Sequence, residues 1–98
     1  MATFIVLGSF TDQGIRTIKE SPKRADAFKA LAGKVGVKVK DIYWTLGHYD
    51  IVSVVEAPDT ATATSLGLAI ASLGNIRTET LTAFTAEEFG NILGKMPA

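Results

Sequence analysis

Two apolar, β-prone runs joined by a Gly-His pair constrain the fold of this chain more than any other feature. The first run covers about 37–46 and the second about 50–56. Glycine readily adopts the positive φ that the first central residue of a type II′ turn requires. Gly47 and His48 therefore predict a tight hairpin of two antiparallel strands.

The register of this hairpin follows from its turn, because successive pairs step outward from it. The facing pairs are predicted to be Leu46 with Tyr49, Thr45 with Asp50, Trp44 with Ile51, Tyr43 with Val52, Ile42 with Ser53 and Asp41 with Val54. Both faces are then largely apolar, whereas a hairpin with one wet face alternates apolar and polar residues. Helices usually cover only one face of such a sheet, so we expect a second subunit on the other.

The composition limits the classes of partner. A chain of 98 residues suits one domain, 1–98, and is small enough to benefit from further burial in an oligomer. Ten Lys and Arg balance ten Asp and Glu and are spread along the chain. A nucleic-acid or anionic-membrane binder normally carries a basic patch, so neither partner is expected. The absence of cysteine excludes disulfides, thiol nucleophiles and thiolate metal sites.

We expect a cytoplasmic protein. The first residues lead into an apolar run without the basic region of a signal peptide, and that run stops at Ser9. The longest charge-free stretch, 60–76, is too short and too polar to span a bilayer.

Periodicity and capping residues predict the order βαββαβα. The expected elements are a strand at 4–10, a short helix capped by Thr11, a helix at 22–33, strands at 37–46 and 50–56, a helix at 60–73, a strand at 76–84 and a final helix opened by the capping box Thr85 to Glu88. Gly14 is expected to let its backbone approach another segment closely. The charge-free helix 60–73 is expected to be covered by its own sheet and by another subunit, and the final helix to turn Phe89, Ile92 and Leu93 inward.

Two right-handed crossovers that share the central hairpin give a ferredoxin-like α+β fold with a four-stranded antiparallel sheet in the order 4-1-3-2. In this topology the ends of strands one and two lie along the same edge as the starts of strands three and four. Three glycine-bearing segments, 11–16, 46–50 and 73–77, are therefore predicted to converge there.

These segments carry a resemblance to a known family. The runs 11–14, 43–50 and 74–80 resemble the GYD domain family, a group of small, mostly uncharacterised prokaryotic proteins, and the resemblance spans nearly the whole chain. The eponymous Gly-Tyr-Asp corresponds to Gly47, Tyr49 and Asp50, with His48 between them. The resemblance implies a ferredoxin-like fold that associates through its open sheet face into a dimeric α+β barrel, and it implies no established reaction.

Several side chains at the predicted edge are candidates for a site. His48 and Asp50 could act as a general base with an orienting carboxylate, which makes them the candidate catalytic pair. The candidate ligand-binding residues are Asp12, Arg16, Trp44, Tyr49 and Arg77. Two arginines favour an anionic or carbonyl-bearing ligand, because a guanidinium presents paired donors.

The same residues also have structural interpretations. Asp50 could accept backbone N–H groups near Thr11 or pair with Arg16 or Arg77, and Trp44 could be a core or interface anchor. A metal would have to use Asp12, Asp50 and Glu79, and we predict neither a metal nor another cofactor.

Three functions follow as alternatives. The primary one is a homo-oligomeric protein that binds a small molecule at the sheet edge. The second is a structural or interaction module without a ligand, and the third is a small enzyme that uses the His48 and Asp50 pair.

Overall fold

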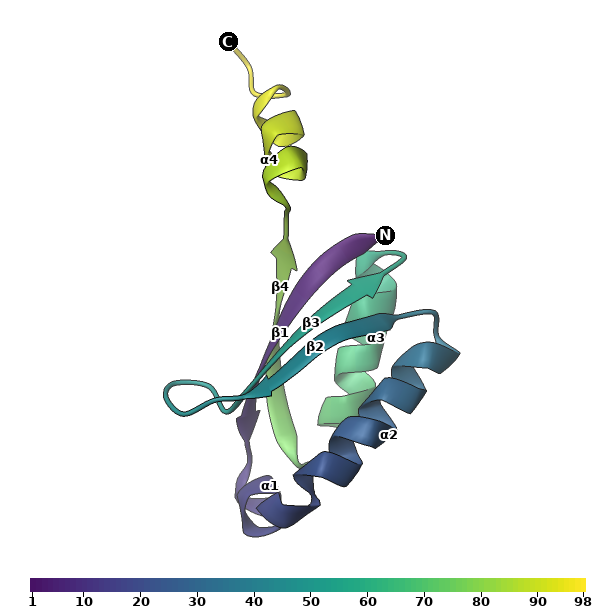
Figure 1. The fold of residues 1–98 in the computed structure, drawn as a ribbon, viewed down its shortest axis with the longest axis vertical. Coiled ribbons are helices and arrows are strands. Elements are labelled where there is room, and N and C mark those ends of the chain that lie inside the picture. The colour runs from purple at the N-terminus through teal and green to yellow at the C-terminus, as the bar shows by residue number, and fades with distance from the viewer.

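The structure, a computed structural model, describes residues 1–98 in the predicted order, with a short 3-10 helix added before the first long helix (Figure 1). The elements are β1 (Ala2–Phe10), α1 (Asp12–Arg16), η1 (Ile18–Glu20), α2 (Ser21–Lys34), β2 (Lys38–Trp44), β3 (Ile51–Ala57), α3 (Thr60–Ala71), β4 (Ile76–Ala83) and α4 (Ala86–Leu93). None of these helices combines the length and the hydropathy that crossing a bilayer requires.

The four strands form one antiparallel sheet in the order β2-β3-β1-β4, which is the predicted order read from the other edge. The helices α2 and α3 lie on the same side of this sheet, as Figure 1 shows. The ferredoxin-like α+β fold is therefore confirmed. The opposite side of the sheet, the open face, has no helix over it.

The central hairpin keeps the predicted register but not the predicted turn. Trp44 pairs with Ile51 and Ile42 with Ser53, as the sequence indicated. The ladder then ends with the Thr45 N–H donating to the Asp50 carbonyl at 2.8 Å, and Leu46 and Tyr49 exchange no backbone hydrogen bond. Gly47 has φ +147°, outside the region of a type II′ turn, so the connection is a wider loop than two residues.

The core lies between the sheet and α2 and α3. Phe4 and Val55, each 1% exposed, are its largest fully buried side chains. Only 11 of the 98 residues are buried, which is a small core for a chain of this length. Much apolar surface therefore remains for contacts outside this single chain.

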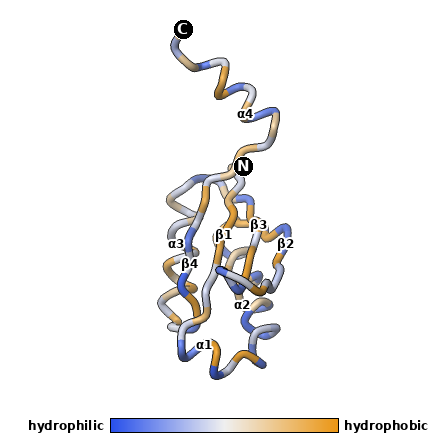
Figure 2. The backbone as a smooth tube through the Cα atoms, turned by 90° about the vertical axis from the view of Figure 1, so that its left-hand side faces the viewer, coloured by the Kyte–Doolittle hydropathy of each residue, from blue (hydrophilic) through white to orange (hydrophobic).

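The final helix is the one element whose placement was wrongly predicted. Its capping box forms, because Thr85 Oγ1 accepts from the Glu88 N–H at 3.1 Å and Glu88 Oε1 accepts from the Thr85 N–H at 2.8 Å. However, α4 projects beyond the end of β4, away from the rest of the molecule (Figures 1 and 2), and none of its residues is buried. Phe89, Ile92 and Leu93 are 52%, 37% and 49% exposed instead of facing inward.

The projection of α4 makes the molecule elongated. Its radius of gyration is 14.8 Å, and its longest extent is 53 Å. A compact domain of 100 residues has a radius of gyration of about 13 Å. An amphipathic pattern specifies that a helix has an apolar side, but it does not specify which surface covers that side, and this explains the wrong prediction.

Candidate functional site

Two of the three predicted segments meet directly at the edge of the sheet where β1 ends. The Thr11 N–H donates to the Asn75 carbonyl at 3.2 Å, and Thr11 Oγ1 donates to the Gly74 carbonyl at 2.5 Å. Gln13 Nε2 adds bonds to the Leu73 carbonyl and to Asn75 Oδ1, at 3.2 and 2.9 Å. The start of α1 is therefore fixed against residues 73–75.

Gly14 is the reason that these backbones can approach so closely. A Cβ at this position would lie 1.9 Å from the Asn75 carbonyl oxygen and 2.8 Å from the Asn75 carbonyl carbon. Both are backbone atoms that cannot rotate away, so position 14 requires glycine. The predicted close approach of the Gly14 backbone is confirmed.

Asp50 ties the hairpin loop to this edge. Its Oδ2 accepts from the Phe10 N–H at 2.9 Å, and its own N–H donates to the Gly8 carbonyl at 2.8 Å. Within the loop, Thr45 Oγ1 donates to the Tyr49 carbonyl at 2.6 Å. The structure thus places the Asp50 carboxylate on a backbone amide next to Thr11. No ion pair joins Asp50 to Arg16 or Arg77, because the one ion pair in the structure is Lys23 with Glu20 at 3.9 Å.

Tyr49 connects the hairpin loop to β4, the strand that flanks β1 on the side away from β3. Its hydroxyl donates to Glu79 Oε2 on β4 at 2.6 Å, and this hydrogen bond raises the pKa of Tyr49, because ionisation would remove the donated proton beside a carboxylate. The exposed ring of His48 lies edge-on to the Tyr49 ring, with centroids 4.9 Å apart. No hydrogen bond joins His48 to Asp50.

The remaining polar candidates are on the surface. Asp12 and Arg16 are exposed on α1, and Arg77 is exposed on β4 opposite Ser9. No group of three or more His, Cys, Asp or Glu side chains is placed to hold a metal ion. The edge therefore brings Asp50, Tyr49 and the α1 backbone together, while the two arginines have no acidic partner there.

Trp44 lies on the other face of the hairpin from Tyr43, with the helices. It is 48% exposed, so it is not a core residue of the single chain, and it lines a partly open cavity of about 210 Å³ between the sheet, α2 and α3. Ser21 and Ser53 line the same cavity, and neither was a candidate from the sequence. The available signal was Ser53 itself, a small polar residue with apolar residues on both sides along β3.

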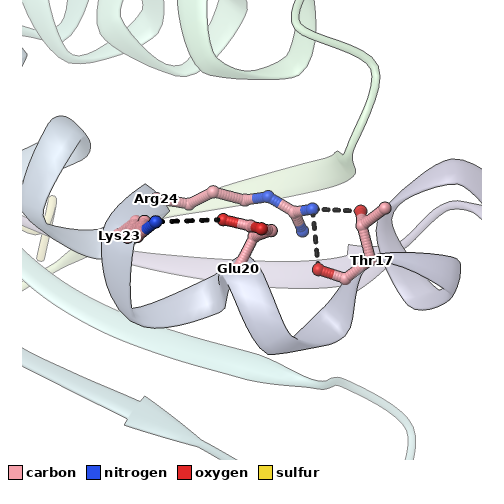
Figure 3. A network of polar contacts seen from close by, with 4 residues as sticks. All are labelled: Thr17, Glu20, Lys23 and Arg24. Atoms are coloured by element: carbon pink, nitrogen blue, oxygen red, sulfur yellow. Dashed lines mark hydrogen bonds and ion pairs between the residues drawn. The ribbon is translucent and has the colours of Figure 1, made fainter.

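A second contact missed from the sequence fixes α2 relative to α1 (Figure 3). The Arg24 guanidinium donates to the Thr17 carbonyl at 2.9 Å and to the Thr17 hydroxyl. It also donates to the Gly14 carbonyl at 3.3 Å. Three acceptors around one guanidinium leave it largely satisfied by its own chain.

At this edge of the sheet, most of the polar groups that meet one another form hydrogen bonds within the chain, and few reactive groups are left without a partner. Asp50 is occupied by a backbone donor and Tyr49 by Glu79, and His48 faces solvent without an orienting partner. The cavity on the helix side differs from the edge in both respects. Its walls are mainly apolar, and its two serine hydroxyls have no hydrogen-bond partner.

Comparison with known proteins gives the family. The model of the GYD domain matches residues 4–93. The chain is 44% identical over 84 residues to the glutamine synthetase and cystathionine beta-lyase binding protein of Thermus thermophilus, covering 85% of this chain and 88% of that protein. A crystal structure of a protein from Thermus thermophilus superposes with a TM-score of 0.57 at 28% identity, covering 88% of this chain and 96% of that one. The chain therefore belongs to the GYD domain family.

Proposed function

We propose that this protein is a homo-oligomeric interaction module that binds other proteins, with glutamine synthetase and cystathionine beta-lyase as its first candidate partners. The observation that carries the proposal is the 44% identity, over most of both chains, to a relative named for binding these two enzymes. The shape of the molecule supports it, since two separate apolar surfaces are left uncovered by the chain itself.

The first surface is the open face of the sheet, which we assign to a second copy of the chain. Alternation along the strands turns Ile5, Leu7, Val52 and Val54 away from the helices that bury Phe4 and Val55. Leu81, 41% exposed, stands beside Ile5 on β4. These residues form a continuous apolar patch across three strands, and such patches on an uncovered sheet favour association.

The energy scale is compatible with this assignment. Fully burying one large apolar side chain is worth about 1.5–3 kcal/mol, and association costs about 4–15 kcal/mol. Covering several half-buried side chains on each of two copies is therefore of the size needed to offset that cost.

The second surface is the apolar side of α4, which we assign to the enzyme partner. Phe89, Ile92, Leu93 and Met96 have the i, i+3, i+4, i+7 spacing of a helix that lies in a groove of another protein. Met96 continues the stripe beyond the end of the helix, since its N–H donates to the Leu93 carbonyl at 3.2 Å. Being separate from the body, α4 can enter a groove without a change in the sheet.

The proposal is tested by biolayer interferometry with purified glutamine synthetase and cystathionine beta-lyase from the same organism. We expect the protein to bind at least one of them. Ile92→Asp should weaken binding by about tenfold or more, because it puts a charge at the centre of the apolar stripe. Asn91→Asp adds the same charge to the neighbouring exposed position, and it should bind like the unaltered protein.

Three results would count against this assignment. Failure of the unaltered protein to bind either enzyme would remove both candidate partners. Equal losses for Ile92→Asp and Asn91→Asp would indicate a general charge effect. A lower oligomer mass for Ile92→Asp with enzyme binding unchanged would mean that a second copy covers α4.

The small-molecule site at the sheet edge stays a prediction. Its members Asp12, Arg16, His48 and Arg77 make no hydrogen bond or ion pair through their side chains, so they are free to meet a ligand. Binding of an anionic or carbonyl-bearing ligand depends on that freedom. Enzymatic use of His48 with Asp50 also requires Asp50, whose carboxylate accepts from the Phe10 N–H. Loss of ligand binding in Asp50→Asn, with little loss of stability, would support the site.

A further inference from the structure

The cavity between the helix layer and the sheet is separate from both proposed protein-binding surfaces. Its volume is about 210 Å³. It lies on the helix side of the sheet, opposite the open face, and α4 contributes nothing to its walls. A dry apolar cavity of roughly 150 Å³ in a folded protein is large enough to bind benzene. This cavity can therefore hold a small molecule with one ring or a short chain.

Two buried hydroxyls line this cavity without hydrogen-bond partners. Ser21 Oγ and Ser53 Oγ are the only buried side-chain polar atoms of the structure that lack a partner, and the two residues are 7% and 4% exposed. An unpaired buried hydroxyl destabilises a fold, by roughly 1–3 kcal/mol judged from protein substitutions. Valine or alanine would be the more stable choice at both positions if they served packing alone.

Small residues keep the cavity open where larger ones would fit. Gly67 lies in the interior of α3, where glycine is less favourable than alanine by about 1 kcal/mol. A Cβ there would meet only Thr78 Oγ1 and Thr80 Oγ1, both at the ordinary contact distance of 3.8 Å. Close packing therefore does not require this glycine, in contrast to Gly14.

The charges around the cavity restrict its ligand. Arg24 is the one charged residue of the lining, and its guanidinium already donates to Gly14 and Thr17. No acidic side chain is present in the walls. A charged ligand would thus lose its hydration without gaining a free counter-charge. An uncharged molecule would lose little, and one with a hydroxyl or carbonyl could pair with a serine.

From these observations we propose that the space between α2, α3 and the sheet is a binding site for a small, uncharged, mainly apolar molecule whose hydroxyl or carbonyl group hydrogen-bonds to Ser53 or Ser21. Trp44, which lines the cavity from β2, contributes aromatic surface to the same site. The inference does not rest on the interaction-module proposal, since the two involve different surfaces and different ligands.

The test uses three probes of one shape, namely benzyl alcohol, toluene and benzoate. Trp44 is the only tryptophan, so its fluorescence reports binding, and amide shifts in a two-dimensional NMR spectrum locate it. We expect benzyl alcohol to bind most tightly and benzoate most weakly, with shifts at Ala63 and Leu66 and none at Leu81. Ser53→Ala, or its combination with Ser21→Ala, should weaken the binding of benzyl alcohol about three- to tenfold and leave the affinity for toluene unchanged.

Matched variants separate binding from folding. Ser65→Ala removes an exposed hydroxyl from α3 and should change nothing. Ala25→Leu fills the cavity from α2 and should abolish binding of all probes, whereas Ala30→Leu on the exposed side of α2 should not. Thermal unfolding confirms that each variant is folded.

The proposal fails if no probe shifts the helix-side amides. It also fails if benzyl alcohol and toluene lose affinity equally in the serine variants. If binding maps to the open face, or survives in a folded Ala25→Leu variant, the cavity is only loose packing.

Discussion

Asp50 fastens the hairpin loop to β1 through one charged hydrogen bond, which makes it the residue most informative to replace. Asp50→Ala would leave the Phe10 N–H without an acceptor, and we expect a loss of about 1–3 kcal/mol in the free energy of unfolding. Asp50→Asn keeps an acceptor oxygen, so its loss should be smaller. His48→Ala in the same loop removes an exposed side chain and should stay within about 0.5 kcal/mol.

Urea unfolding measures these differences. If Asp50→Ala were as stable as His48→Ala, the carboxylate would not be a structural acceptor, and the predicted edge site would gain support. The sequence indicated both interpretations of Asp50. It could not choose between them, because the choice depends on which β1 amide the loop reaches.

Gly14 and Gly33 form a second test at the residue scale. Gly14→Ala places a methyl group on the Asn75 backbone, and we expect it to cost about 3 kcal/mol or more, or to displace α1. Gly33→Ala lies in α2 with nothing within 4 Å, so it should stabilise the protein by up to about 1 kcal/mol. Thermal unfolding of the two variants should show shifts of opposite sign, and shifts of the same sign would contradict the close approach at Gly14.

At the scale of elements, two helix starts are held by carboxylates whose stabilising effect depends on pH. The Thr62 N–H lowers the pKa of Asp59 below its usual 3.8, and the Thr85 N–H lowers the pKa of Glu88 below its usual 4.5. A lowered pKa in the folded state means that the contribution is fully present above the unfolded value and is lost as pH falls through the folded one.

We therefore expect the free energy of unfolding to decrease as pH falls below about 4.5, with α4 fraying first because nothing packs on it. Asp59→Asn and Glu88→Gln keep acceptor oxygens at both caps and should flatten this dependence. The measurement is urea unfolding between neutral pH and about pH 3, below the reference pKa values of both carboxyls, with the Thr85 amide shift as a local probe. An unchanged pH profile in the double variant would show that other carboxylates dominate.

The elements themselves were largely predictable, because each depends on local signals. The capping box at Thr85 and the hairpin register come from neighbouring residues or from period-two alternation, and both are confirmed. The turn at Gly47 and the inward packing of α4 were wrong. The first depends on how Asp50 anchors the loop, and the second on which surface covers α4, which the residues of the helix do not specify.

At the scale of the whole molecule, the uncovered sheet face gives a direct prediction of association. Leu81→Arg introduces a charge into the open face beside Ile5, and it should convert the proposed oligomer to a monomer or raise its dissociation constant strongly. Thr82→Arg adds the same charge one residue along β4, on the side away from the patch, and should keep the mass of the unaltered protein. Light scattering during size exclusion measures both, and a monomeric unaltered protein at micromolar concentration would contradict the prediction.

The topology and the convergence of α1 with residues 73–75 followed from chain direction and handedness alone. The cavity could not be predicted from the sequence. Ser21 and Ser53 belong to different elements, and only the packing of α2 against the sheet brings them to the same cavity. Hydrophobic periodicity predicts helices and strands, but it does not predict a cavity between a helix layer and a sheet.

The same cavity has a mechanical consequence. Pressure favours whichever state has the smaller volume, and any part of this space of about 210 Å³ that water does not fill in the folded protein is eliminated on unfolding. The folded protein is therefore expected to unfold at lower hydrostatic pressure than its Ala25→Leu variant, whose larger side chain fills part of that space. A molecule bound in this space would fill it and reduce the volume that unfolding eliminates. Binding should therefore raise the pressure at which the protein unfolds.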